Sequence, residues 1–202
     1  MKLIGRYLSP FARRVGTTLH WLNLPYEHLA YSPAKDADAI RSFNPMNKVP
    51  VLVMDNGEVL IESAAILDSV LEPIAGQELL PATGAGRRHV LQHCGIMTSA
   101  LDKCLGILYE RSKRPAEKIH QPYVDGLILQ AQAGVDQIEQ LVSSGKFAGI
   151  AKPTLADITA AVGFTFISTM LPEVCSAERH PNLAALAADF ENTPAFKACP
   201  IK

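Results

Sequence analysis

The 202-residue sequence lacks the cysteine spacing that would indicate a disulfide framework or a zinc site. It contains four cysteines, none in a C-x-x-C pair: Cys94, Cys104, Cys175 and Cys199. Such isolated cysteines are typical of free thiols in a reducing compartment. His89 and His93 are four residues apart on a predicted helix, but no third residue nearby has metal-ligand spacing. We therefore expect neither disulfides nor a bound metal.

An excess of charge of either sign is also missing. The 19 basic and 20 acidic residues give a formal net charge of -1, so no overall field would attract nucleic acid or an acidic membrane surface. The most apolar run, residues 158–171, is shorter than the roughly 18 to 20 residues of a membrane span and is interrupted by polar side chains. Residues 1–8 do not resemble a secretory leader. These absences predict a cytoplasmic protein with no nucleic-acid or membrane partner.

Alternating strand and helix patterns fill the first third of the chain. Hydrophobic residues make up 48% of the sequence, enough for a real core. Asn56-Gly57 between two apolar runs is a strong hairpin signal, and Ser63 is expected to cap the helix that follows. The predicted elements, in order, are a strand over 2–7, a helix over 11–22, a strand over 26–30, a weak helix over 36–43, strands over 49–54 and 58–61, and a helix from residue 63.

Prolines and glycines interrupt this pattern near residue 76, and beyond them the apolar residues recur only at helical spacing. We therefore predict an α/β domain over residues 1–75, a linker over 76–86 and an all-helical domain over 87–202. The first domain has the β-α-β-α-β-β-α order of a thioredoxin-like layout.

Several short motifs carry a family resemblance through their order and spacing. They are Ser9-Pro10-Phe11-x-Arg13, Asn44-Pro45-x-x-Lys48-Val49-Pro50-x-Leu52, Glu62-Ser63, Glu78-Leu79-Leu80-Pro81, Thr154-Leu155-Ala156-Asp157 and His180-Pro181-Asn182-Leu183. With them the chain resembles the cytosolic glutathione transferases over nearly its whole length. The resemblance implies a thioredoxin-like glutathione-binding domain followed by a helical bundle. Glutaredoxin-like and omega-like relatives carry a cysteine near the position of Ser9, and the lack of a cysteine here argues against thiol-disulfide exchange. The chain looks most like the bacterial serine-type transferases.

The chemistry of such a protein depends on ionising the glutathione thiol. A free thiol with a pKa of about 8.5 is only about 3% thiolate at pH 7, and the thiolate is the nucleophile. Ser9, at the start of the predicted helix, can donate a hydrogen bond to the sulfur beside the helix amides. Ser9 also fits a simple N-cap. Tyr7 is the alternative donor, because several transferase classes use a tyrosine at the end of this strand, although Tyr7 also fits the core.

The resemblance assigns the rest of the glutathione site. Val49-Pro50 resembles the family's cis-proline element, in which the backbone of Val49 pairs with the cysteinyl backbone of glutathione. Ser63 would hold the γ-glutamyl carboxylate and Glu62 its ammonium group, although Ser63 also fits a plain helix cap. Lys48 would take the glycyl carboxylate.

Other motif residues have less defined roles. Thr154-x-x-Asp157 is a capping box with Asp in place of the usual Glu or Gln, so both residues should serve folding. Arg13 is expected on a solvated face. Three residues are candidate walls of a second-substrate pocket, although each also fits the core: Phe11, Met97 and Tyr109. The resemblance also assigns Phe11 to glutathione binding.

The function implied by the resemblance is transfer of the glutathione thiolate to a small hydrophobic electrophile by a homodimer. Glutathione-dependent peroxide reduction or isomerisation would use the same thiolate. A non-catalytic glutathione-binding or scaffold protein would keep the site without turnover. No motif identifies the electrophile, because scattered apolar side chains build such pockets.

Overall fold

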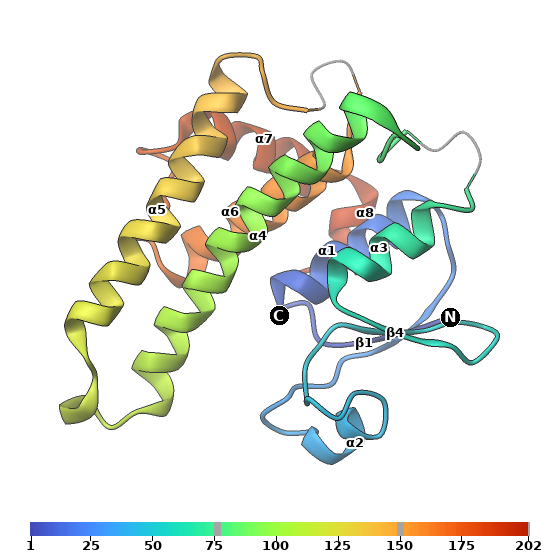
Figure 1. Cartoon of the computed structure of the whole chain (residues 1–202), viewed down its shortest axis with the longest axis horizontal. Coiled ribbons are helices and arrows are strands. Elements are labelled where there is room, and N and C mark those ends of the chain that lie inside the picture. The colour runs from blue at the N-terminus through green and yellow to red at the C-terminus, as the bar shows by residue number, and fades with distance from the viewer. Residues whose placement is uncertain (75–77, 149–151, 202) are drawn as a thin grey trace. The chain divides into compact units, whose positions relative to one another are not determined.

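The computed structural model describes residues 1–74, 78–148 and 152–201 (Figure 1). The chain divides into two compact units, of which the first comprises Met1–Gln77 with Phe190–Lys202 and the second Glu78–Asp189. The predicted boundary between residues 75 and 76 lies outside the described residues. Helix α4 (Gly84–Lys113) begins within the segment predicted as a linker.

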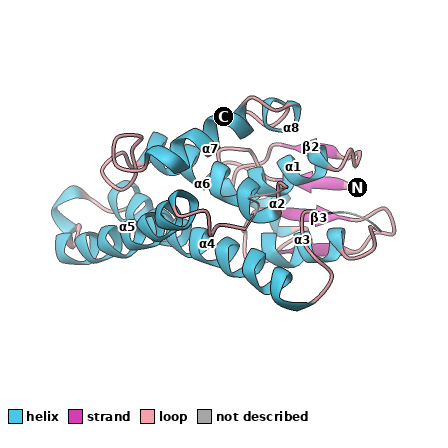
Figure 2. Ribbon diagram, turned by 90° about the horizontal axis from the view of Figure 1, so that it is seen from above, coloured by secondary structure: helices cyan, strands magenta, loops and turns pink. Residues whose placement is uncertain are grey.

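A four-stranded sheet in the order β2-β1-β3-β4 forms the centre of the first unit (Figure 2). Strand β1 is parallel to β2 and antiparallel to β3, and β3 is antiparallel to β4. This confirms the thioredoxin-like layout, although each strand is only three residues long. The strands are β1 (Lys2–Ile4), β2 (Glu27–Leu29), β3 (Val51–Val53) and β4 (Val59–Ile61).

Helices pack on this sheet through apolar faces. Helix α1 (Pro10–Trp21) follows β1, and α3 (Ser63–Leu71) follows β4. The short helix α2 (Ala37–Arg41) contributes the fully buried Ile40 to a cluster with Ile4 and Val51. The predicted helices are therefore present, with bounds that differ by a few residues.

The C-terminal segment belongs to the first unit, and Arg13 joins it to α1. The Arg13 side chain is 2% exposed, and its Nη1 and Nη2 atoms each donate a 2.7 Å hydrogen bond to Glu191. Its Nε atom donates to the carbonyl of Cys199 at 2.7 Å, and its guanidinium lies 5.3 Å from the ring centroid of Phe196 in α8 (Pro194–Lys197). The expectation of a solvated Arg13 is wrong, because a partner from the other end of the chain covers it.

The second unit is built from helices. Its elements are α4, the 3-10 helix η1 (Ala116–Lys118), α5 (Gln121–Ser143), α6 (Leu155–Met170) and most of α7 (Pro181–Glu191). Helices α4 and α5 pack along each other (Figure 1). The most apolar of them, α6, is the predicted buried helix. A Cβ at its Gly163 would clash with Sδ of Met97 in α4, so the glycine allows the two helices to pack closely. No helix among the described residues is long and apolar enough to cross a membrane.

The predicted capping box begins α6. One carboxylate oxygen of Asp157 accepts hydrogen bonds from the Thr154 amide at 2.8 Å and from the Thr154 hydroxyl at 2.7 Å, while the Ala156 amide donates to that hydroxyl at 3.2 Å. Asp157 is 5% exposed, and burial raises the pKa of its carboxyl. The capping box thus satisfies polar groups that the apolar helix leaves without partners at its start.

Candidate glutathione site

The register of the sheet brings three chain segments to one edge. Ile4 at the end of β1 pairs with Val51 at the start of β3, and Val51 pairs with Ile61 at the end of β4. The segments that follow β1, precede β3 and follow β4 therefore share this edge. They carry Ser9, Val49-Pro50 and Glu62-Ser63.

Gly5 allows the first two of these segments to meet. It has a φ of 131°, and a Cβ there would lie 2.9 Å from Cβ of Val49 and 3.0 Å from Cβ of Ala12, in the first turn of α1. Such distances leave no room for a side chain, so a glycine at this strand end lets the loop before β3 pack beside α1. The Val49–Pro50 peptide bond is cis, as the resemblance led us to expect.

Ser9 is the N-cap residue of α1. Its Oγ atom accepts a hydrogen bond from the Ala12 amide at 3.3 Å, and Pro10 occupies the first turn of the helix. A hydroxyl that accepts one bond can still donate its own proton. The side chain is partly exposed, and the first turn carries no acidic residue that would offset the positive end of the helix dipole. The capping role is thus observed, and it leaves the proton of Ser9 available to a ligand.

Tyr7, in contrast, directs its phenol into the first unit. It is 7% exposed, its hydroxyl is 2.6 Å from that of Tyr26, and its ring stacks on His28 at a centroid distance of 4.0 Å. A Cβ at Gly16, in the second turn of α1, would lie 2.6 Å from its ring. Burial raises the pKa of Tyr7. The phenol is therefore committed to a partner within the core.

Glu62 and Ser63 begin α3 in an order that differs from our expectation. The N-cap residue is Glu62, with φ 65° and ψ 117°, and Ser63 is the first helical residue. The prediction that Ser63 caps the helix is wrong, because the chain turns into α3 through a left-handed conformation at Glu62. That conformation is uncommon for a residue other than glycine and tends to occur at ligand sites. Ser63 is 4% exposed, and Arg14 donates a 3.4 Å hydrogen bond to its Oγ atom.

Lys48 and Glu62, predicted to hold opposite ends of glutathione, bind each other. Nζ of Lys48 lies 2.6 Å from Oε1 of Glu62, and the side chains are 60% and 58% exposed. Exposed pairs of this kind contribute about 0 to 1 kcal/mol, so a charged ligand can replace either partner at little cost.

Asn44, named in the sequence analysis only as part of a family motif, supports the loop before β3. Its side chain donates to the carbonyl of Lys48 at 3.0 Å and accepts from the Met46 amide at 3.1 Å, and the residue is 1% exposed. The signal that could have indicated this role is an asparagine before a proline, since such side chains often bind the backbone of a following turn.

Among the candidate pocket walls, Phe11 lies half-buried in the first turn of α1, the turn that Ser9 caps. The other two belong to the second unit, where Met97 is fully buried and Tyr109 is 50% exposed. His93 is 7% exposed, accepts a 3.1 Å hydrogen bond from the Ala148 amide and so serves the fold. Among residues 1–74, 78–148 and 152–201, no three potential metal ligands cluster together.

Comparisons with known proteins agree with this arrangement. Residues 3–78 match the family model described as the N-terminal domain of glutathione S-transferases. Over these residues the chain is similar to that domain family. A glutathione S-transferase structure from Methylobacterium radiotolerans, in complex with glutathione sulfonate, superposes with a TM-score of 0.90 at 28% identity over 98% of this chain and 93% of that one.

Curated relatives extend the similarity over both units. The uncharacterized GST-like protein YibF of Escherichia coli strain K12 is 26% identical over 89% of each chain. Maleylpyruvate isomerase from a Ralstonia species is 29% identical over 98% of this chain and 95% of its own. The comparisons thus support the glutathione transferase family and confirm the predicted fold class, a thioredoxin-like domain with a helical C-terminal region.

Proposed function

We propose that this protein is a serine-type glutathione transferase that transfers the glutathione thiolate to a small hydrophobic electrophile. One observation above the others supports the proposal. The sheet register brings Ser9, the cis Val49–Pro50 bond and the start of α3 to one edge of one unit. The charge pattern at that edge matches a tripeptide with charged ends and a central thiol.

Glutathione fits these residues group by group. The hydroxyl of Ser9 and the first amides of α1 would face the thiol, and the backbone of Val49 would pair with the cysteinyl backbone. Ser63 and the start of α3 would hold the γ-glutamyl carboxylate, with Glu62 near its ammonium group. Lys48 would leave Glu62 for the glycyl carboxylate. The present ion pair is therefore exchanged for two contacts with the ligand.

The reaction depends on lowering the thiol pKa. A decrease of about two units corresponds to roughly 2.7 kcal/mol of preference for the thiolate and leaves most of the bound thiol ionised at pH 7. The thiolate then attacks the electrophilic carbon, a C–S bond forms, and the leaving group departs with its bonding electrons. Ser9 supports the thiolate as a hydrogen-bond donor and keeps its proton.

Isomerisation is the second candidate, favoured by the 29% identity to maleylpyruvate isomerase across nearly the whole chain. It would use the same thiolate, which adds to an unsaturated acid and leaves again after bond rotation. The two functions therefore share the glutathione site and differ in the second substrate.

A substrate panel on the full chain tests the proposal. Glutathione affinity is measured by calorimetry, and turnover is then followed with 1-chloro-2,4-dinitrobenzene, cumene hydroperoxide and maleylpyruvate. We expect turnover of the halonitroarene that falls in Ser9→Ala. Turnover of maleylpyruvate alone would favour the isomerase, and binding without any turnover would indicate a glutathione-binding protein of another kind.

We also propose a homodimer, as the resemblance implies. Sedimentation equilibrium at micromolar concentration should give the mass of two chains, and the mass of one chain would refute the dimer.

A further inference from the structure

The connection between β1 and α1 ends in Ser9 and is bound to the segment around β2. The Gly5 amide donates to the carbonyl of Leu29 at 2.9 Å. The Arg6 amide donates to the carbonyl of Tyr31 at 3.1 Å. The Ser9 amide in turn donates to the carbonyl of Arg6 at 3.0 Å, which closes a tight turn before the helix. The position of Ser9 therefore depends on how the first residues of this connection are held.

His28 in β2 adds a side-chain hydrogen bond to this connection. Its Nε2 atom lies 2.9 Å from the carbonyl oxygen of Gly5. A carbonyl oxygen can only accept, so Nε2 carries a proton in the neutral as well as in the protonated imidazole, and the bond holds in both forms. Gly5 has a φ of 131° and no side chain to restrict its backbone. His28 therefore restrains the residue of the connection that has the greatest backbone freedom.

The same imidazole ring packs on Tyr7, two residues before Ser9. The two ring centroids are 4.0 Å apart, and the ring planes are inclined by 11°. The hydroxyl at the far end of the Tyr7 ring lies 2.6 Å from that of Tyr26, so the ring is held on its face and at its tip. His28 thus contacts two residues of the short connection between the end of β1 and Ser9.

We propose that His28 is a positioning residue, which fixes the place of the Ser9 hydroxyl and through it supports the thiolate of bound glutathione. The inference rests on the proposed transferase function. His28 holds Gly5 and the ring of Tyr7, and the turn that follows carries this restraint to Ser9. A hydrogen bond weakens steeply as its geometry departs from the optimum, so a displaced Ser9 hydroxyl stabilises the thiolate less. The ring of Tyr7 takes part in this restraint, whereas its hydroxyl has no role at the sulfur.

The ultraviolet absorbance of the glutathione thiolate, titrated with pH in complexes of the full chain, tests this inference. His28→Phe keeps a flat ring on Tyr7 but removes the N–H donor to Gly5. It should raise the pKa of the bound thiol by about half a unit, which is less than the effect of deleting the Ser9 hydroxyl itself. His28→Gln keeps an N–H donor and should raise that pKa less than His28→Phe does. Glutathione affinity should stay within about twofold of the wild type in both variants, because the charged ends of the ligand keep their contacts.

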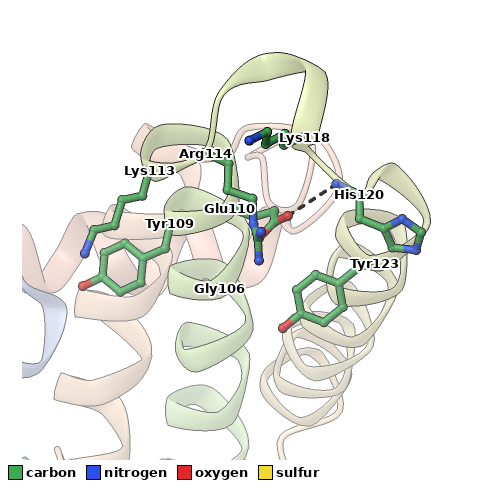
Figure 3. A pocket seen from close by; sticks show the side chains of 8 residues that line it. All are labelled: Gly106, Tyr109, Glu110, Lys113, Arg114, Lys118, His120 and Tyr123. Atoms are coloured by element: carbon green, nitrogen blue, oxygen red, sulfur yellow. Dashed lines mark hydrogen bonds and ion pairs between the residues drawn. The ribbon is translucent and has the colours of Figure 1, made fainter.

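Further variants separate positioning from a general loss of stability. In the Ser9→Ala background, His28→Phe should cause no further rise of the thiol pKa, because two residues that act through one contact are not additive. His20→Phe, at the exposed end of α1, is the nearby control. His120→Phe is the remote control, since this exposed residue belongs to the second unit and its ring points away from Glu110 in Figure 3. Both controls should keep the wild-type thiol pKa.

Urea denaturation of each variant shows whether it folds, and His28→Gln in the two backgrounds replaces His28→Phe if the latter does not. A wild-type thiol pKa in the His28 variants would overturn the inference. An equal rise with and without the Ser9 hydroxyl would also overturn it, because His28 would then act by another route. A wild-type complex in which the thiol pKa equals that of free glutathione would instead refute the proposed transferase function, and this inference with it.

Discussion

Arg13 in α1 and Glu191 at the end of α7 form two 2.7 Å hydrogen bonds, although 178 residues separate them in the sequence. The Arg13 side chain is 2% exposed, whereas that of Glu191 is 32% exposed. Through this pair and the carbonyl of Cys199, the C-terminal segment holds the helix that Ser9 caps. The segment is therefore structurally part of the first unit.

We predict that Glu191→Gln lowers the free energy of unfolding by about 2 to 3 kcal/mol, because it leaves the buried Arg13 charge poorly compensated. This is below the roughly 3 to 5 kcal/mol for breaking a fully buried pair, since Glu191 is partly solvated. The double variant Arg13→Met, Glu191→Leu should recover most of the loss. Urea denaturation measures all three proteins. A Glu191→Gln variant as stable as the wild type would show that the pair contributes little.

The capping box gives a second stability prediction. Asp157→Ala should lower the free energy of unfolding by about 1 to 2 kcal/mol, because two hydrogen bonds at the start of α6 are lost. Asp157→Asn keeps a carbonyl oxygen as acceptor and should lose less. Glutathione affinity, measured by calorimetry, should be unchanged in both, since Asp157 lies in the second unit. An unchanged melting temperature together with a loss of glutathione affinity would show that Asp157 belongs to the ligand site and does not stabilise the fold.

His93 should make the second unit sensitive to acid. Burial, and to a smaller extent the charge of His89, lowers the pKa of His93 below its ordinary value of 6.5. The unfolded state therefore binds the proton of His93 more tightly than the folded state does. The contribution of His93 to the free energy of unfolding is present above pH 6.5 and is lost as the pH falls through the folded-state pKa. Protonation would also remove the acceptor of the Ala148 amide.

Urea midpoints at pH 7.5 and 5.5 test this prediction. His93→Gln should lose less stability between the two pH values than the wild type, whereas the exposed His120→Gln should follow the wild type. Equal pH dependence of wild type and His93→Gln would contradict it.

Loss of the Lys48–Glu62 ion pair should affect glutathione binding more than it affects the stability of the fold. Lys48→Met and Glu62→Gln should each change the free energy of unfolding by no more than about 1 kcal/mol, because the pair is exposed. Each should weaken glutathione binding measurably, since each loses a charged contact with the ligand. Calorimetry on the two variants decides the matter. Native affinity in both would remove these residues from the site.

Features set by neighbouring residues could be predicted from the sequence. The apolar run around Val51 and the Asn56-Gly57 pair indicated the β3–β4 hairpin, because strand alternation and turn preference are local properties. The start of α6 followed from the spacing of Thr154 and Asp157, which determines their hydrogen bonds.

Features set by distant contacts or by backbone conformation could not be predicted from the sequence. Arg13 was expected on a solvated face, because its partner Glu191 comes from the far end of the chain. Nothing in the residue type of Glu62 indicates a φ of 65°, so Ser63 was taken as the cap of α3. The partner of the Tyr7 hydroxyl, Tyr26, was equally hidden, because the two hydroxyls meet only in the folded first unit.

The choice between Ser9 and Tyr7 is central to the proposed chemistry. Ser9 caps α1 with its own proton still available, whereas the hydroxyl of Tyr7 is 2.6 Å from that of Tyr26 inside the unit. Ser9→Ala should therefore raise the pKa of the bound glutathione thiol, while Tyr7→Phe should act mainly on stability through the lost buried hydrogen bond.

The ultraviolet absorbance of the glutathione thiolate, titrated with pH in complexes of the wild type, Ser9→Ala and Tyr7→Phe, tests this most directly. The account predicts that Ser9→Ala raises the pKa of the bound thiol by about one unit, or roughly 1.4 kcal/mol, with little loss of glutathione affinity. Tyr7→Phe should leave that pKa close to the wild-type value. A larger shift in Tyr7→Phe than in Ser9→Ala would contradict the assignment of Ser9 and make this a tyrosine-type protein.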